Sequence, residues 1–229
     1  MASVPRGVTI EEWNDDLARE HDIDAYYARS NPIVRAIEGR RLRLIRSLVG
    51  PHPHERLLEV GCGGGHVLER FPECDLVGVD VSGAMLEKAR DRLAGLRVEL
   101  HKGELGAVDL EPTSFDAVIC TEVLEHVVDP GSVLAAIADL VKPNGRAVIT
   151  FPNDPLITRA KGLLRRSGAA ALPPLKGIDW GGDQYHLHVW TIREMRALLS
   201  SHFDIAREAH APFRSAPVRC CFLVRPTAG

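Results

Sequence analysis

The chain has 229 residues, of which 45% are hydrophobic and 26% charged, and its formal net charge is −3. This length and composition predict one sizeable folded domain, with or without an insertion. The small negative charge gives no support for nucleic-acid binding by bulk electrostatics, and no apolar run approaches the length of a membrane span, so neither nucleic acid nor a membrane span is expected.

The first part of the chain is predicted to be helical. Thr9 and Glu12 form a capping-box pattern, which indicates the start of a first helix. Apolar residues at helical spacings predict a second helix from Ile33 to Val49, and Pro51 follows it. After that point the pattern of apolar and polar residues changes.

From Arg56 onwards, short apolar runs alternate with amphipathic segments. This order predicts crossover units, a parallel sheet and helices on both of its faces. The expected strands are RLLEV (56–60), DLVGVD (75–80), RVELH (97–101), FDAVICT (115–121) and GRAVITF (145–151). The expected helical segments are GHVLERF (65–71), SGAMLEKARDRLAG (82–95) and PGSVLAAIADLVKPNG (130–145).

The last third of the chain departs from this rhythm. Residues 153–190 are long and irregular, which is typical of a lid or binding loop. Thr191 and Glu194 form a second capping box that starts a helix. Two strand-like runs without a helix between them, 204–212 and 220–226, predict an antiparallel hairpin. The expected fold is a doubly wound α/β sheet of seven strands, mostly parallel, with that hairpin at its C-terminal end.

The five cysteines are an odd and scattered set, which fits neither a disulfide framework nor a zinc site. Several stand in apolar runs, where a free cysteine packs as a small hydrophobic residue. We therefore expect a reducing, cytoplasmic location. The set is Cys62, Cys74, Cys120, Cys220 and Cys221.

A glycine-rich turn, EVGCGGGH, directly follows the first strand of the parallel part and is expected to open a helix at the carboxyl edge of the sheet. Asp80 ends the next strand about 20 residues later, where nucleotide-binding units place an acid for the ribose hydroxyls. Glu59, two residues before the first glycine, is a poor neighbour for phosphate but suits an ammonium group. S-adenosylmethionine carries an ammonium group and no phosphate.

The sequence at this point resembles the class I S-adenosylmethionine-dependent methyltransferases, whose fold is Rossmann-like. The resemblance covers about Arg56 to Asn153, with five segments in the family's order and spacing. These segments are LLEVGCGGGH, GVDVS, KGELGAVDLEPTSFDAVIC, TEVLEHVVDP and LVKPNGRAVITFPN. Five ordered matches are far more specific than the glycine turn alone.

The resemblance implies the cofactor, S-adenosyl-L-methionine, with S-adenosyl-L-homocysteine as product. Asp80 would accept hydrogen bonds from the ribose hydroxyls, and Glu104, where the family usually has aspartate, from the adenine amino group. The positions implied to line the cofactor are Glu59, Gly61, Cys62, Gly63, Asp80, Val81, Gly103, Glu104, Leu105 and Thr121.

The resemblance also implies a division of the chain. Residues 1–53 are expected to form a helical cap over the cofactor and acceptor site, and residues 54–229 the methyltransferase domain with its lid at about 153–190. Tyr27 and Arg29 either touch the cofactor carboxylate or belong to a simple connection between helices. The basic run from Lys161 to Arg166 is expected to be a solvated helix face rather than an acceptor-binding patch.

Methyl transfer to a hydroxyl also requires loss of a proton, for which histidine is the favoured base. The candidate catalytic residues are His126 and His186, with His188 as a third histidine near the same strand ends. No metal ligand is predicted, although Glu122, Glu125, His126 and His186 are an open alternative set for a divalent ion, as in ubiquinone-biosynthesis and small-RNA methyltransferases.

The sequence therefore predicts an enzyme that methylates an oxygen of a small-molecule metabolite or natural-product intermediate. One alternative is methylation of an RNA end or a peptide, which would require a broad basic surface beside the pocket. An alternative of another class is a non-catalytic module that binds S-adenosylmethionine. The sequence gives no indication of the oligomeric state.

Overall fold

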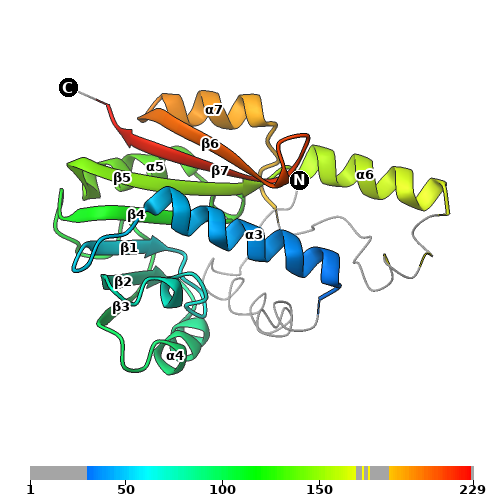
Figure 1. Cartoon of the computed structure of the whole chain (residues 1–229). Helices are drawn as coiled ribbons and strands as arrows, with labels where there is room; N and C mark the ends of the chain where they lie inside the picture. Colours follow the sequence, from blue (N-terminus) through cyan, green and yellow to red (C-terminus); the bar gives the residue numbers. More distant parts are fainter. Residues whose placement is uncertain (1–29, 169–171, 173–174, 176–185, 228–229) are drawn as a thin grey trace, which may run out of the picture.

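The structure, a computed structural model, describes residues 30–168, 172, 175 and 186–227 (Figure 1). Its centre is a seven-stranded sheet in the order β3-β2-β1-β4-β5-β7-β6. The first five strands run parallel, while β7 is antiparallel to both β5 and β6. The predicted fold class, including the antiparallel C-terminal hairpin, is confirmed.

The strands match the predicted runs closely, except that the fifth begins at Val141 and the seventh at Ala216, each four residues before the predicted run. Residues 141–145 therefore belong to a strand and not to the predicted helical segment 130–145. The strands are β1 (Arg56–Val60), β2 (Asp75–Asp80), β3 (Val98–Lys102), β4 (Phe115–Thr121), β5 (Val141–Pro152), β6 (Phe203–Phe213) and β7 (Ala216–Pro226).

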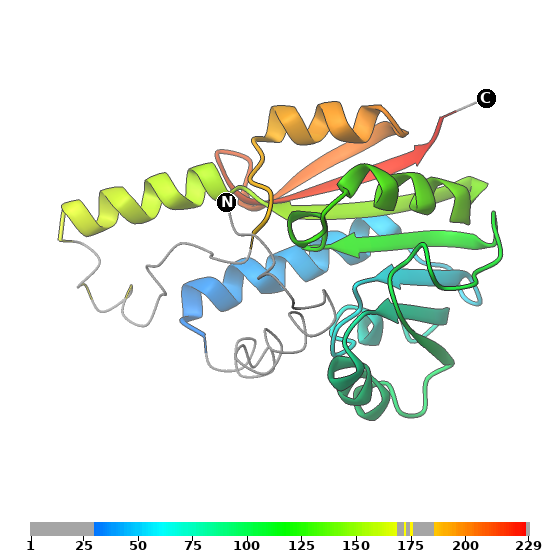
Figure 2. The same cartoon turned by 180° about the vertical axis from the view of Figure 1, so that it is seen from behind.

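Helices cover both faces of the sheet, as Figures 1 and 2 show from opposite sides. The described helices are α3 (Pro32–Val49), α4 (Gly83–Arg92), α5 (Pro130–Leu140), α6 (Asp154–Arg166) and α7 (Ile192–Ser200), with 3₁₀ turns η1 (Leu68–Arg70) and η2 (Leu124–His126). None of the helices within the described ranges combines the length and the apolar character needed to cross a bilayer.

Two hydrophobic clusters lie on the two sides of the sheet. In one cluster, α5 and α7 pack against the sheet, and in the other α3 and α4 do so. Along β4 the side chains alternate between the clusters: Val118 and Cys120 belong to the first, Ala117 and Ile119 to the second. This two-sided burial explains why the strand is a continuous apolar run rather than an alternating one.

The prediction that the glycine turn opens a helix is wrong. The chain after the turn forms only the three-residue 3₁₀ turn η1. Gly61, Gly63 and Gly65 all have positive φ angles (68°, 48° and 80°), which breaks any helical run at its start. Pro72 then follows within two residues of the end of η1, so no room remains for a full helix. The turn therefore presents its N–H groups without an α-helix dipole behind them.

The second capping box is confirmed: the Thr191 side chain accepts from the backbone of Glu194, whose carboxylate accepts from Thr191 N–H. The predicted lid begins with α6, which has no buried residue, and most of its remainder lies outside the described residues. The predicted first helix, with Tyr27 and Arg29, also lies outside them. The described part of the predicted cap, α3, packs against β6 and β7, and the cap itself stays a prediction.

Candidate functional site

The glycine turn is fastened to the end of the neighbouring strand by Asp80. One carboxylate oxygen of Asp80 accepts from Gly63 N–H at 2.7 Å, and the other accepts from Ser82 N–H at 2.9 Å. A Cβ atom at Gly61 would lie 2.4 Å from a methyl group of Val123, a distance that real Cβ atoms do not tolerate. The turn therefore needs glycine at this position, and it brings its backbone close to the carboxyl ends of β1 and β2.

Glu59 lies beneath this turn and is almost completely buried, with 1% of its surface exposed. Burial raises the pKa of its carboxyl group well above the ordinary value, partly opposed by Arg41 and reinforced by the negative charge of Asp80. One of its two oxygens, Oε2, has no hydrogen-bond partner among the described residues. An ammonium group nearby would stabilise the ionised form of this buried acid.

The shifted pKa of Glu59 gives a prediction for Glu59→Gln. Because the folded-state pKa is raised, the protonated carboxyl stabilises the fold fully below the ordinary value of 4.5, and this contribution is lost as the pH rises. Glutamine does not ionise, so the melting temperature of the variant minus that of the native protein should increase between about pH 5 and about pH 8. The increase should be several degrees, because 1 kcal/mol corresponds to roughly 2–4 °C.

Thermal unfolding without cofactor measures this difference. The exposed Glu87 on α4 offers a matched control, since Glu87→Gln should give the same shift at both pH values. If Glu59→Gln changes the melting temperature equally at both pH values, ionisation of Glu59 does not destabilise the fold.

The other residues expected to line the cofactor lie along the same edge of the sheet. Gly103 N–H donates to the Asp80 carbonyl at 3.0 Å, which brings the end of β3 against the end of β2. Glu104 is exposed and Leu105 buried. Thr121 is buried at the end of β4, and Val81 is partly buried directly after β2.

Cys62 is buried within the glycine turn, and burial next to the negative charges of Glu59 and Asp80 raises the pKa of its thiol. A thiol held in its neutral form is a poor nucleophile. Cys62 therefore contributes backbone and shape to the turn rather than chemistry.

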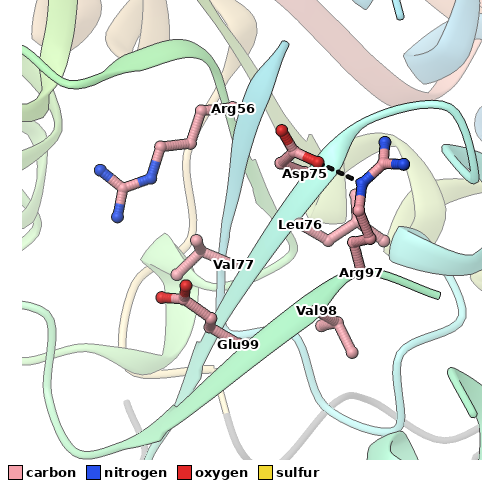
Figure 3. Close-up of a pocket in the computed structure, with 7 residues that line it drawn as sticks. All are labelled: Arg56, Asp75, Leu76, Val77, Arg97, Val98 and Glu99. Carbon is pink, nitrogen blue, oxygen red and sulfur yellow. Dashed lines mark hydrogen bonds and ion pairs between the residues drawn. The ribbon is translucent and has the colours of Figure 1, made fainter. Parts of the chain in front are cut away.

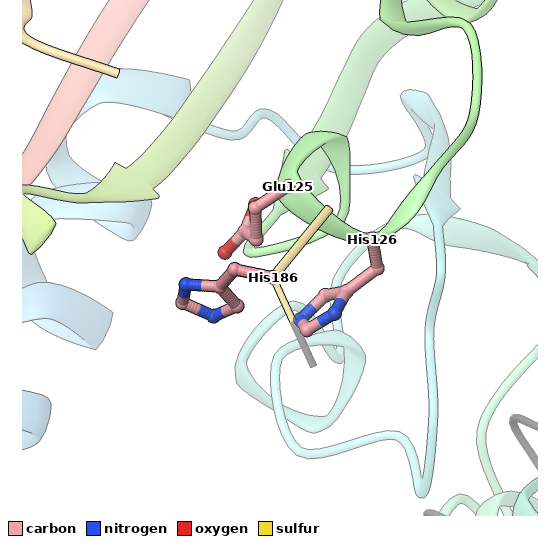
Figure 4. Close-up of side chains that lie close together, drawn as sticks. All are labelled: Glu125, His126 and His186. Carbon is pink, nitrogen blue, oxygen red and sulfur yellow. The ribbon is translucent and has the colours of Figure 1, made fainter. Parts of the chain in front are cut away.

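His126 and His186 meet beyond the end of β4. Their rings stand edge to face with centroids 4.9 Å apart, His126 on η2 and His186 at the start of the segment that leads to α7. Figure 4 shows both rings beside the Glu125 carboxylate. His186 Nδ1 lies 2.7 Å from a carboxylate oxygen of Asp154, the first residue of α6. The two histidines predicted to be catalytic are thus brought together.

His188, the third histidine near these strand ends, is held differently. Its Nε2 lies 2.9 Å from the carbonyl oxygen of Val127, and its ring stacks on Trp190 at a centroid distance of 5.0 Å. These contacts give His188 a structural role.

Glu125 is buried, and both its carboxylate oxygens lack a hydrogen-bond partner within the part of the chain that the structure describes. Burial and the negative charge of Glu122 raise the pKa of Glu125 to about 8, and His186 acts in the opposite direction. Ligand atoms of Glu125, His126 and His186 lie within 4.8 Å of one another, so these three side chains could hold a divalent ion.

Glu122 does not belong to that group, contrary to the four-residue alternative. It has a left-handed backbone (φ 54°), and its carboxylate accepts from Thr150 Oγ1 at 2.8 Å. The same carboxylate pairs with Arg219 at 3.3 Å and with Arg41 at 3.7 Å. The alternative assumed a helical turn from Glu122 to His126, whereas the 3₁₀ turn begins only at Leu124.

Sequence reasoning missed a buried ion-pair network behind the site. Glu38 accepts from Arg41 at 2.8 Å and from Arg219 at 3.1 Å, and both arginines also approach Glu122. The only sequence signal is the i, i+3 spacing of Glu38 and Arg41, which usually marks a solvated pair. Asp154 was missed as well, because nothing in the sequence pairs it with His186.

The basic run from Lys161 to Arg166 lies on α6, in agreement with the predicted solvated helix face. A groove drawn in Figure 3 lies at the opposite edge of the sheet, around the amino ends of the first three strands. It is lined by Arg56, Asp75, Leu76, Val77, Arg97, Val98 and Glu99. Because Asp80 stands at the other end of β2, this groove is separate from the candidate site.

Comparison with known proteins identifies a matching domain and curated relatives. Residues 58–149 match the family of methyltransferase domains. Curated relatives named "Ubiquinone biosynthesis O-methyltransferase" include one from Alkalilimnicola ehrlichii, 36% identical over 118 residues (49% of this chain, 48% of the relative). Another, from Photobacterium profundum, is 33% identical over 156 residues (63% and 62%). The chain spans about half the length of the curated relatives it matches.

Solved structures share the fold. The N-methyltransferase NodS from Bradyrhizobium japonicum, in complex with S-adenosyl-L-homocysteine, has a TM-score of 0.67 at 18% identity and covers 96% of this chain and 100% of its own. Magnesium protoporphyrin IX methyltransferase from Synechocystis, with bound SAH, has a TM-score of 0.65 at 19% identity and covers 95% and 100%. Residues 58–149 thus match a methyltransferase domain, and the seven-stranded sheet is shared with solved structures of methyltransferases.

Proposed function

We propose that the chain binds S-adenosyl-L-methionine at the carboxyl edge of its sheet and transfers the methyl group to an oxygen of a small-molecule acceptor. The observation that carries this is the position of Asp80, whose carboxylate joins the end of β2 to the glycine turn. The names of the curated relatives support oxygen as the acceptor atom, and acceptors of ubiquinone biosynthesis are therefore the first to test.

The residues at this edge fit the cofactor chemically. Asp80 suits ribose hydroxyls, and Glu59 suits an ammonium group and would be a poor neighbour for a pyrophosphate. Val81 would offer an apolar contact to the adenine, with Glu104 at its amino group and the Leu105 backbone N–H as a donor to its ring. When bound, the cofactor supplies an electrophilic methyl group on its sulfonium.

The chain's own contribution to the reaction is positioning, exclusion of water and removal of a proton. His126 and His186 lie beyond the end of β4, near Thr121, and we assign them the role of holding the proton that leaves the acceptor hydroxyl. The lid that begins with α6 and ends near His186 would cover the acceptor.

Replacing Asp80 by alanine should weaken S-adenosylmethionine binding about 10- to 150-fold, since a charge-assisted hydrogen bond contributes roughly 1.5–3 kcal/mol. Calorimetry measures the Kd directly. Asp75 begins the same strand at its other end and pairs with Arg97, so Asp75→Ala is the matched control and should leave the Kd unchanged. If Asp80→Ala binds S-adenosylmethionine as tightly as the native protein does, Asp80 does not bind the ribose.

The proposed function itself is tested by two measurements. Calorimetry with S-adenosylmethionine and with NAD should show binding of the first only, and preference for NAD would overturn the proposal. Candidate acceptors are then screened for formation of S-adenosylhomocysteine. Cofactor binding without turnover on any acceptor would favour the non-catalytic module, while salt-sensitive binding and methylation of RNA would favour the polymer alternative.

We also propose a reducing compartment, the cytoplasm, as the place of action. All five cysteines are free and buried. Cys220 and Cys221 are adjacent residues of β7 that belong to clusters on opposite faces of the sheet, so their side chains point apart. Free, buried cysteines that form no disulfide are typical of proteins in a reducing compartment.

A further inference from the structure

His186 makes a close contact with a carboxylate that no sequence pattern assigns to the site. Its Nδ1 lies 2.7 Å from Asp154 Oδ2, and the two side chains are only 8% and 16% exposed. Asp154 is the first residue of α6, but it does not cap that helix. Asn153 does so, accepting from Leu156 N–H. The Asp154 carboxylate is therefore directed to His186 rather than to its own helix end.

The contact joins two separate parts of the chain. Asp154 follows the end of β5, while His186 is 32 positions further along, at the far end of the predicted lid. Nearby backbone bonds fix the same segment, because Leu187 N–H and His188 N–H both donate to the Glu125 carbonyl, at 2.8 Å and 3.2 Å. The imidazole of His186 is thus held on its backbone side by η2 and on its Nδ1 side by Asp154.

The Asp154 carboxylate determines which ring nitrogen of His186 carries a hydrogen. An ionised carboxylate only accepts hydrogen bonds, so the ring nitrogen that faces Asp154 must carry a hydrogen. In the neutral imidazole the second nitrogen, Nε2, then carries the lone pair. The partner of one ring nitrogen thereby decides which nitrogen takes a proton from a reacting group.

We propose that Asp154 is a positioning residue for methyl transfer, which holds neutral His186 in the tautomer with hydrogen on Nδ1 and the lone pair on Nε2. This rests on the proposed function in that the lone pair receives the proton of the acceptor hydroxyl. The tautomer itself is a property of the protein alone and is measured without any acceptor.

The first measurement is nitrogen-15 NMR of the imidazole rings in the full-length protein at a pH above the ordinary histidine range. The His186 signals are identified by their loss in His186→Gln. The expected result is the Nδ1–H tautomer in the native protein and in Asp154→Glu, which retains a carboxylate, and a shift towards the Nε2–H tautomer in Asp154→Ala. A native protein with hydrogen on Nε2, or a tautomer that Asp154→Ala leaves unchanged, would overturn the proposal.

The second measurement is steady-state kinetics with an acceptor found by the screen. Asp154→Ala should lower kcat about 10- to 100-fold with little change in cofactor Kd, and Asp154→Glu should recover part of the loss. Asp91, an exposed acid on α4, provides the control Asp91→Ala, which should retain native kcat. Native kcat in folded Asp154→Ala would contradict the positioning role. If no acceptor is turned over, the proposed function fails, whereas the NMR result still decides the tautomer.

Discussion

Replacing His186 by alanine is expected to lower kcat for methyl transfer to a hydroxyl about 10²- to 10⁴-fold, the usual contribution of a positioned general base. The His186 side chain is only 8% exposed, meets His126 at a centroid distance of 4.9 Å and is held by Asp154, so its ring occupies a fixed place. The Kd for S-adenosylmethionine should change little, because the residues assigned to the cofactor lie on other segments. Initial-rate kinetics and calorimetry on the same preparation separate the two effects.

The matched control is His202→Ala, since His202 lies at the end of α7 beside Phe203 and away from the site. It should keep native kcat. A His186→Ala variant that also keeps native kcat would exclude this residue as the base and leave His126 to be tested in the same way.

A chelator gives the complementary result. Histidine as the base predicts that turnover survives treatment with EDTA. Loss of turnover that Mg²⁺ restores would instead assign Glu125, His126 and His186 to a divalent ion, whose ligand atoms the structure places within 4.8 Å of one another.

Replacing Arg41 by alanine is expected to destabilise the fold by about 3–5 kcal/mol, the typical cost of leaving a buried charge without its partner. Arg41 is only 5% exposed and donates to Glu38 at 2.8 Å. Burial opposes ionisation of Glu38, and the charges of Arg219 and Arg41 outweigh it, so the pKa of Glu38 is lowered. Without Arg41, Arg219 would be the remaining arginine of this network to neutralise both Glu38 and Glu122.

Urea unfolding gives the free-energy change, and thermal unfolding should show a loss of about 6–20 °C, at roughly 2–4 °C per kcal/mol. Arg196→Ala is the matched control, because Arg196 forms an exposed pair with Glu208. Such surface pairs contribute about 0–1 kcal/mol. Similar effects of the two substitutions would mean that the network around Glu38 contributes no more than a surface pair.

Local patterns were sufficient for most of the fold. The continuous apolar run of β4 predicted two-sided burial, and Val118 and Ile119 do lie in different clusters. The capping box at Thr191 predicted the start of α7, and the two runs after it predicted the hairpin. Each of these features depends on residues close in sequence, where spacing determines geometry.

The parts that could not be predicted depend on contacts between distant segments or on unusual backbone angles. Three positive φ angles in the glycine turn prevented the expected helix. The left-handed backbone of Glu122 turned its carboxylate towards Arg219 and away from His126. The contact of Asp154 with His186 spans 32 positions, and no local spacing encodes it.

The pairing of Glu38 with Arg219 spans 181 positions of the chain. On a ribosome, α3 emerges well before the arginine that neutralises its buried acid. Helix α3 and the hairpin can therefore dock only after β7 has been synthesised, and until then part of the apolar side of α3 stays available to chaperones. A premature stop codon between α3 and β7 would leave that part of the surface uncovered.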